Sequence, residues 1–187
     1  MKFKLYLAGK ITKNGWRNKI VKNLREETAK YCQNLTNAKN MDKSFPVLEK
    51  AIFDRFHYTG PFFMGCDHGC FHGKNTHGFG LNTKGCSHEL EILPNEVFNL
   101  CKDAIRRCDI FFAWIDSDDS YGTFVEIGLA KAMCRYVIIG FSKYDLEKWF
   151  VYESADSLIQ GESPIHALKH GLTELFGKYE DTINKMT

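Results

Sequence analysis

The sequence predicts a single α/β domain, residues 1–187, built on a doubly wound and mostly parallel sheet. Two observations support this. Short apolar runs alternate with segments of helical periodicity along the chain. Two of the runs, 109–115 and 136–141, are almost continuously apolar, as strands are when helices cover both faces of a parallel sheet. A length of 187 residues fits one such domain.

The first half of the chain provides two expected strands and one expected helix. Residues 2–8 are apolar and aromatic, and Gly9 ends this run at a sharp turn. Apolar residues recur at helical spacing over 16–39, which predicts a helix with a polar outer face. A second strand is expected within 51–58, because Thr-Gly-Pro follows it.

The second half alternates more regularly. Pro94 is suited to a first helical turn, and basic residues lie near the end of that helix, as the helix dipole favours. Right-handed crossovers between parallel strands then imply a Rossmann-like (flavodoxin-like) fold, with ligands beyond the carboxyl ends of the strands. The expected elements are helices at 94–108 and 122–133, strands at 109–115 and 136–141, and amphipathic segments at 144–152 and 164–178.

Composition narrows the class of protein. The formal charge of +2, from 25 basic and 23 acidic residues, provides no strong field for binding nucleic acid or an anionic membrane. No apolar run has the length of a signal-peptide core or a membrane span, so we expect a cytoplasmic protein. Its seven cysteines are an odd number in a domain of this size, which favours reduced thiols over disulfides.

Acidic and hydroxyl side chains are concentrated after the apolar run 109–115, in the segment 116–123. Asp116 follows that run directly, and Glu126 lies about one turn into the next helix. Side chains of a helix tilt toward its N-terminus, so Glu126 is expected to point back to the strand ends. A carboxylate among apolar and small residues needs a function or a partner. The alternative is a solvated or ion-paired helix residue.

The segments KLYLAGK and WIDSDDSYGTFVEIGLA resemble the nucleoside 2-deoxyribosyltransferases and related nucleotide N-glycosidases. The resemblance covers the first strand and about 95–140, and leaves 40–89 unexplained. It implies that Glu126 is a nucleophile and that Asp116 is an acid or a positioning carboxylate. Ser120 stands where nucleotide-cleaving relatives carry a serine that contacts a 5′-phosphate, which favours a nucleotide ligand.

Six other residues are candidates for ligand binding. Backbone donors at a glycine turn or a helix N-terminus suit a phosphate, although Thr123 could be only a cap. Tyr6 is equally compatible with a core position. The aromatic face of Trp16 and the guanidinium of Arg17 suit a base or a phosphate. The alternative for these two residues is a packed indole beside a surface arginine. These candidates are Tyr6, Gly9, Trp16, Arg17, Gly122 and Thr123.

The segment 60–89 is predicted to be an elaborated loop insertion, rich in Gly, His and Cys. Its ligand types suit a structural zinc ion, held by Cys66, Cys70, His72 and His77. Alternatively, a histidine such as His68 lies over the ligand and polarises the leaving base. A loop held only by hydrogen bonds is the third interpretation.

The predicted function is cleavage or transfer of the N-glycosidic bond of a small-molecule nucleoside or nucleotide, with no cofactor required for catalysis. The alternatives are a catalytically silent nucleotide-binding or sensing module, an NAD glycohydrolase, and a metal-dependent hydrolase. The resemblance further implies a homo-oligomer such as a homodimer, for which Trp149, Phe150 and Tyr152 are candidate contacts.

Overall fold

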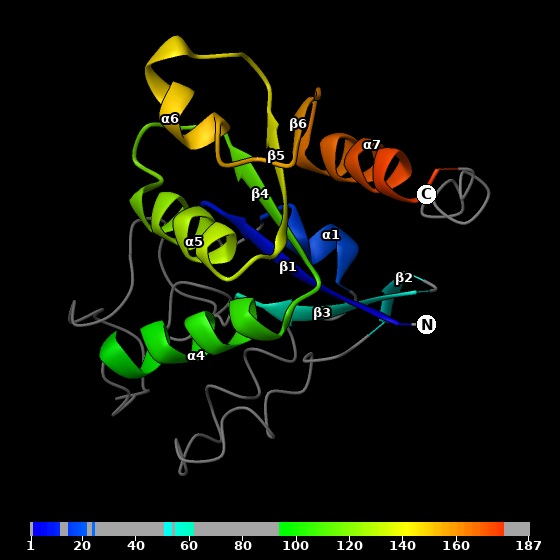
Figure 1. Cartoon of the computed structure of the whole chain (residues 1–187). Coiled ribbons are helices and arrows are strands. Elements are labelled where there is room, and N and C mark those ends of the chain that lie inside the picture. The colour runs from blue at the N-terminus through cyan, green and yellow to red at the C-terminus, as the bar shows by residue number, and fades with distance from the viewer. Residues whose placement is uncertain are drawn as a thin grey trace, which may run out of the picture.

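The computed structural model describes residues 2–11, 15–21, 24, 51–53, 55–61 and 94–177 (Figure 1). Within these residues, six strands form one sheet in the order β2-β3-β1-β4-β5-β6, and every neighbouring pair is parallel except β2 with β3. The strands are β1 (Phe3–Gly9), β2 (Ala51–Phe53), β3 (Phe56–Gly60), β4 (Ile110–Ile115), β5 (Tyr136–Phe141) and β6 (Ser157–Gln160).

Helices follow most of the strands. Ser163 begins the last helix by accepting a hydrogen bond from the amide of His166, with Pro164 in its first turn, so that start is encoded locally. The helices are α1 (Arg17–Ile20), α4 (Pro94–Arg107), α5 (Tyr121–Ala132), α6 (Trp149–Tyr152), which directly follows a 3₁₀ turn (Leu146–Lys148), and α7 (Pro164–Phe176).

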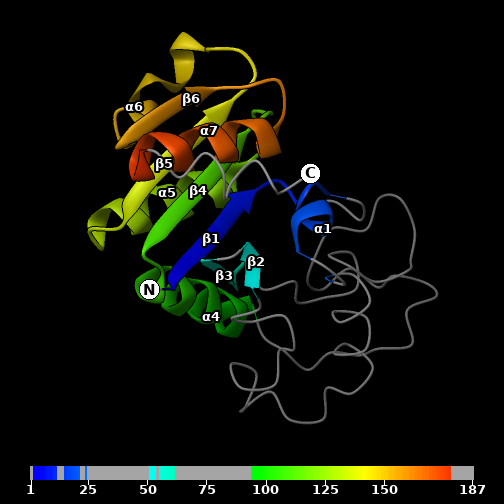
Figure 2. The ribbon, with the colours of Figure 1, turned by 90° about the vertical axis from the view of Figure 1, so that its right-hand side faces the viewer.

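The helices cover both faces of the sheet (Figure 2). On one face, the Tyr6 ring stacks on Phe111 at 5.3 Å, below α4 and α5. On the other face, Trp16 lies edge-on against Phe112 at 5.7 Å, and Ala167 of α7 lies against Gly140. The central strands β1, β4 and β5 are almost wholly buried between these two layers. This mostly parallel α/β arrangement is consistent with the predicted Rossmann-like fold.

Most of the predicted helices and strands are confirmed, with bounds that agree to within about two residues. For β5 the predicted and observed bounds are the same. The single strand expected within 51–58 is wrong, because a turn at Arg55 divides this segment into antiparallel β2 and β3. Strand β6 was not predicted: it has only four residues, of which Ile159 alone is fully buried. Most of the helix expected at 16–39, and the predicted loop from 62 onward, lie outside the described residues.

Among the described residues, no helix has both the length and the apolar character required to cross a bilayer.

A cavity lies where the chain leaves β1 and where α5 begins after β4. Strand β1 is flanked by β3 on one side and by β4 on the other, so the chain changes direction across the sheet at this point. Ligands of open α/β sheets bind outside the carboxyl ends of the strands at such a switch. The residues that follow β1 and β4, and the first turns of α5, meet there.

Candidate active site

Glu126 and Tyr6 form a hydrogen-bonded pair between α5 and β1. The phenol of Tyr6 donates to Glu126 Oε1 at 2.5 Å. Tyr6 is fully buried, while Glu126 is only partly buried and reaches the wall of a cavity. Because one carboxylate oxygen is engaged by a rigid, buried donor, the orientation of the other is set as well.

A glycine in β3 makes room for Tyr6. The β1–β3 register shifts between Leu5 and Tyr6, and Tyr6 pairs with Gly60. A Cβ atom at Gly60 would lie 2.5 Å from Tyr6 Cε2 and 3.3 Å from the Cβ of Ala104. Only a residue without a side chain permits the Tyr6 ring to lie in its observed position.

Burial raises the pKa of Glu126 from 4.5 to about 7, although the hydrogen bond from Tyr6 and the nearby Arg17 charge act to lower it. Burial likewise raises the pKa of Tyr6, and the Glu126 charge adds to that effect, so Tyr6 remains a proton donor. A carboxyl group that titrates near neutral pH inside a cavity is suited to act as a nucleophile or an acid–base group.

The Glu126 cavity has a volume of about 360 Å³. An ion pair of 2.6 Å between Lys10 and Asp119 belongs to its wall. The N-terminus of α5 also opens into it, and the side chain of its N-cap residue, Ser120, makes no capping hydrogen bond, so the first amides of the helix suit an anion. The cavity is lined by Gly9, Lys10, Ile11, Asp119, Ser120, Gly122, Thr123 and Glu126.

Arg17 lies beneath the loop that follows β1. Its guanidinium is 1% exposed and donates hydrogen bonds to the carbonyl oxygens of Leu7 (2.6 Å), Gly9 (2.7 Å) and Lys10 (3.2 Å). Burial lowers its pKa from the ordinary value, whereas the neighbouring Tyr58 and Glu126 act to raise it. The alternative interpretation of Arg17 as a surface arginine is therefore wrong. The structure gives Arg17 a role in positioning the loop, and direct contact with a ligand remains a prediction.

The other binding candidates divide into two groups. Gly9, Ser120, Gly122 and Thr123 line the cavity, and Gly9 has a φ of +139°, which favours glycine at the turn. Trp16 packs against Phe112 and lies 4.8 Å from the Arg17 guanidinium, so it helps to enclose Arg17. Its indole nitrogen is buried without a hydrogen-bond partner in the part of the chain that the structure describes.

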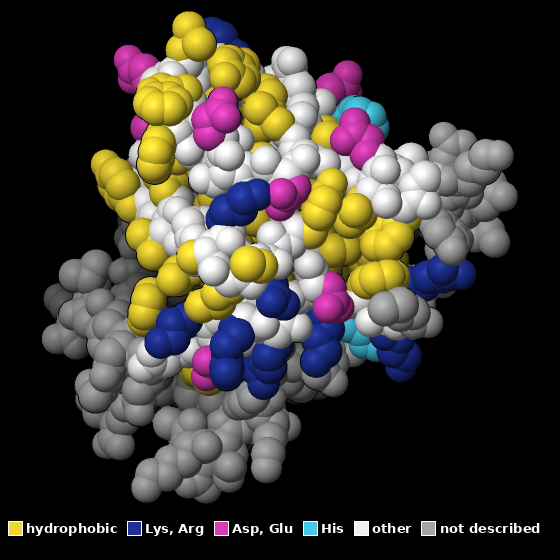
Figure 3. Space-filling model, in the orientation of Figure 1, with side chains coloured by type: hydrophobic (Ala, Val, Ile, Leu, Met, Phe, Trp, Pro, Cys, Tyr) yellow, Lys and Arg dark blue, Asp and Glu magenta, His cyan; other side chains and the backbone are white. Residues whose placement is uncertain are grey.

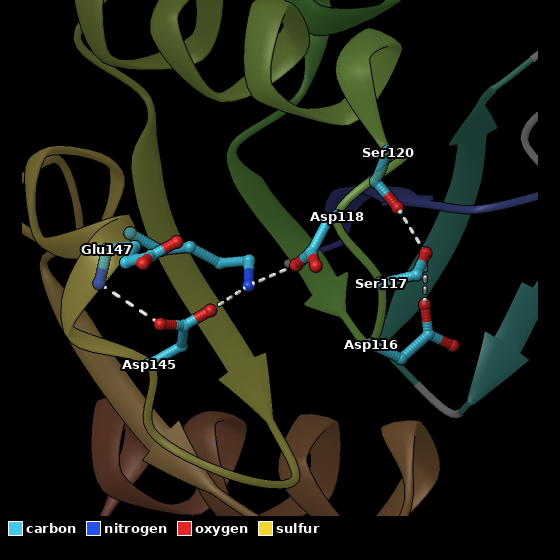
Figure 4. A network of polar contacts seen from close by, with 7 residues as sticks. Asp116, Ser117, Asp118, Ser120, Asp145 and Glu147 are labelled. Atoms are coloured by element: carbon cyan, nitrogen blue, oxygen red, sulfur yellow. Dashed lines mark hydrogen bonds and ion pairs between the residues drawn. The ribbon is translucent and has the colours of Figure 1, made fainter.

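Asp116 does not line the cavity of Glu126. It is exposed at the end of β4 and lines a second cavity of about 480 Å³, toward β5 and α6. Ser117 connects the two cavities: its Oγ lies 3.1 Å from Ser120 Oγ and 3.4 Å from an Asp116 oxygen (Figure 4). The predicted catalytic partnership of Asp116 with Glu126 gains no support from this arrangement.

The candidate zinc ligands Cys66, Cys70, His72 and His77, and the candidate base-polarising His68, lie outside the described residues. Within the described part of the chain, no cluster of three or more His, Cys, Asp or Glu side chains has the geometry of a metal site.

The proposed oligomer contacts differ in exposure. Trp149 and Phe150 are 58% and 73% exposed, whereas Tyr152 is buried and packs against Phe141 with tilted rings. Tyr121 and Val125 of α5 are also exposed, and hydrophobic side chains gather on the surface over α5 and α6 (Figure 3). Trp149 and Phe150 therefore remain candidates for a contact, while Tyr152 is a core residue.

Sequence reasoning missed three residues at the site: Gly60, Lys10 and Ser117. The Thr-Gly-Pro pattern marked Gly60 as a turn, but the close approach of Tyr6 comes from strand pairing. Ser117 and Lys10 each stand next to a predicted site residue, and that adjacency was the available signal.

Comparisons with known proteins add a distant similarity. No protein-family model matches the chain, and no curated protein matches it either. Among solved structures, it is similar to the CMP N-glycosidase BcmB of Clostridium botulinum, with 27% sequence identity and a TM-score of 0.35, over 41% of this chain and 72% of that one.

Proposed function

We propose that this chain is an enzyme that cleaves the N-glycosidic bond of a nucleoside or nucleotide, with Glu126 as the nucleophile. The observation that carries the proposal is the Tyr6–Glu126 hydrogen bond at the wall of a cavity, beyond the ends of β1 and β4. This hydrogen bond engages one Glu126 oxygen and leaves the other for a ligand. Burial raises the pKa of the same carboxyl group to about 7.

The chemistry proceeds in two steps. In the first, the Glu126 oxygen not engaged by Tyr6 bonds to the anomeric carbon, and the bond from that carbon to the base nitrogen breaks with its electron pair on the base. In the second, water bonds to the same carbon and gives up a proton to the released base or to solvent, while the ester bond to Glu126 breaks and restores the carboxylate. A second base in place of water makes the reaction a transfer.

The surrounding residues assist this chemistry. Tyr6 orients Glu126, and as its hydrogen bond favours the ionised form, it also keeps a fraction of the carboxyl groups reactive near neutral pH. Arg17 holds the Gly9 turn in place and contributes a positive charge. Ser120 and the first amides of α5 suit a 5′-phosphate, which favours a nucleotide over a nucleoside.

A panel of nucleosides, nucleotides and NAD, each incubated with and without a second free base, tests the proposal. Chromatography detects released or exchanged base. Glu126→Gln preserves the shape and the Tyr6 hydrogen bond but removes the nucleophile, so release is expected to fall by about 10³-fold or more. Glu153→Gln, an exposed glutamate at the end of α6, is the matched control and should leave release unchanged.

Two outcomes would contradict the proposal. If Glu126→Gln released base as fast as the unmodified chain, Glu126 would not be the nucleophile. Ligand binding that is equally tight in both proteins, with no released base from any compound, would favour the nucleotide-binding module instead.

A further inference from the structure

The second cavity lies beside that of Glu126, beyond the carboxyl ends of β4 and β5. Its volume is about 480 Å³, and its walls come from the end of β4 and the loop after it, the loop after β5, the 3₁₀ turn that precedes α6, and Tyr152 at the end of α6. Cavities of 300–1,000 Å³ are typical of small-molecule sites, so each of the two could hold one nucleoside-sized group. The Glu126 chemistry requires only the first of them.

Asp116 provides an exposed carboxylate in the second cavity. It accepts a long hydrogen bond from Ser117 and has no ion-pair partner among the residues that the structure describes. The nearby Lys148, by contrast, is held between Asp118 (2.6 Å) and Asp145 (Figure 4). A carboxylate at a strand end is the group that accepts hydrogen bonds from ribose hydroxyls in dinucleotide-binding folds.

Tyr144 provides an aromatic surface in the same cavity. Its ring lies 4.9 Å from Tyr152 and 5.7 Å from Phe141, which fixes its position, and the residue is 45% exposed. An immobilised ring with an exposed surface suits stacking by a planar base. Asp116 and Tyr144 together therefore provide contacts for both parts of a nucleoside.

Ser117 and Ser120 lie between the two cavities. Ser120 lines the Glu126 cavity, Ser117 lines the second, and their Oγ atoms are 3.1 Å apart. Two hydroxyl groups beside the N-terminus of α5, where the Ser120 side chain makes no capping hydrogen bond, are suited to a phosphate linker. A ligand that places phosphates there directs one end toward Glu126 and the other toward Asp116.

We infer that the two cavities together bind a pyrophosphate-linked dinucleotide, with the scissile nucleoside at Glu126 and the second nucleoside between Asp116 and Tyr144. The inference deepens the proposed function and rests on it. It makes the substrate larger than a mononucleotide.

Nicotinamide release from NAD and from NMN, its mononucleotide half, tests the inference. We expect kcat/KM to be about ten- to a hundredfold higher for NAD, as the second nucleoside adds a hydrogen bond to a charged group and a stacked ring. Tyr144→Ala should remove most of that advantage and leave NMN turnover unchanged. Tyr144→Phe keeps the ring and should retain the advantage. Equal kcat/KM values for NAD and NMN would overturn the inference.

Calorimetric titration of NAD into Glu126→Gln protein separates binding from chemistry. We expect NAD to bind, and an added Asp116→Asn or Tyr144→Ala change to weaken binding about tenfold or more. An added Asp103→Asn change, on the exposed side of α4, is the control and should have no effect. Failure to bind NAD, or equal weakening by all three changes, would overturn the inference. NAD binding that Tyr144→Ala weakens, with no base released by the unmodified chain from NAD or from any other compound of the panel, would refute the proposed function and leave the dinucleotide site intact.

Discussion

Tyr6 and Glu126 are 120 positions apart in the sequence, yet the phenol of one lies 2.5 Å from the carboxylate of the other. Strand β1 carries the donor and helix α5 carries the acceptor, so both layers of the fold must be correctly packed for the contact to form.

Removing the phenol should alter the pH dependence of base release. In Tyr6→Phe, Glu126 loses a hydrogen bond that favours its ionised form, so its pKa rises above about 7. The low-pH side of the kcat/KM profile should shift to higher pH, and the rate at neutral pH should fall by about 10- to 100-fold. A profile of unchanged shape would show that Tyr6 does not control the ionisation of Glu126.

Glu126 itself should make stability dependent on pH. Its pKa is about 7 in the folded chain, above the ordinary value of 4.5, so the folded state binds this proton more tightly than the unfolded state. The associated stability is complete below the unfolded pKa and is lost as the pH rises through about 7. As the pH rises from about 5 to about 8, the free energy of unfolding of Glu126→Gln should increase by on the order of 1–2 kcal/mol relative to that of the unmodified chain, as measured by urea unfolding. A constant difference between the two proteins would contradict the pKa shift.

Gly60 and Gly128 form a matched pair for testing the Tyr6 pocket. Gly60→Ala places a methyl group 2.5 Å from the Tyr6 ring, whereas a Cβ atom at Gly128 meets no atom within 4 Å. We expect Gly60→Ala to cost about 1–3 kcal/mol and to reduce activity by displacing Tyr6. Gly128→Ala should stabilise α5 by about 0.5–1 kcal/mol without affecting activity. Thermal unfolding measures the stability of the two variants, and base release measures their activity. Equal behaviour of the two variants would argue against the tight Tyr6 pocket.

Replacing Arg17 should affect stability and ionisation together. Arg17→Met leaves three carbonyl groups without their donor and is expected to destabilise the chain by about 2–4 kcal/mol. It also removes a charge that lowers the pKa of Glu126, so the low-pH side of the rate profile should move to higher pH. Arg17→Lys keeps the positive charge, so its rate profile should lie close to that of the unmodified chain. Its free energy of unfolding should recover less, because a lysine cannot replace all three hydrogen bonds. A purely structural role would leave both profiles unchanged in shape.

Trp149 and Phe150 test the proposed homo-oligomer. Both are largely exposed on α6, which contacts α5, and α5 itself exposes Tyr121 and Val125, so a charge there should weaken any contact between copies. Phe150→Glu is expected to shift the mass measured by light scattering from that of an oligomer toward 21.6 kDa. A mass of one chain for the unmodified protein would refute the proposal.

Local pattern was sufficient to predict the central strands and the place of Glu126. The apolar run Tyr136–Phe141 coincides with β5 because a strand buried on both faces has an unbroken apolar sequence. The position of Arg17 could not be predicted in this way, because its partners are main-chain carbonyls whose placement depends on the fold. Asp116 was assigned a catalytic role from the resemblance and from its place at the end of a strand, but the two side chains line different cavities on either side of the Ser117–Ser120 contact.

Among the described residues, the strands at the two edges of the sheet are short, and this affects the tendency of the chain to aggregate at high concentration. Strand β2 has three residues and runs antiparallel to β3, and β6 at the opposite edge has four. Such short edges present few free backbone groups to another chain and are a poor template for intermolecular strand addition. The long, strongly apolar strands β1, β4 and β5 are enclosed between them, so aggregation through cross-β pairing should require the sheet to open first.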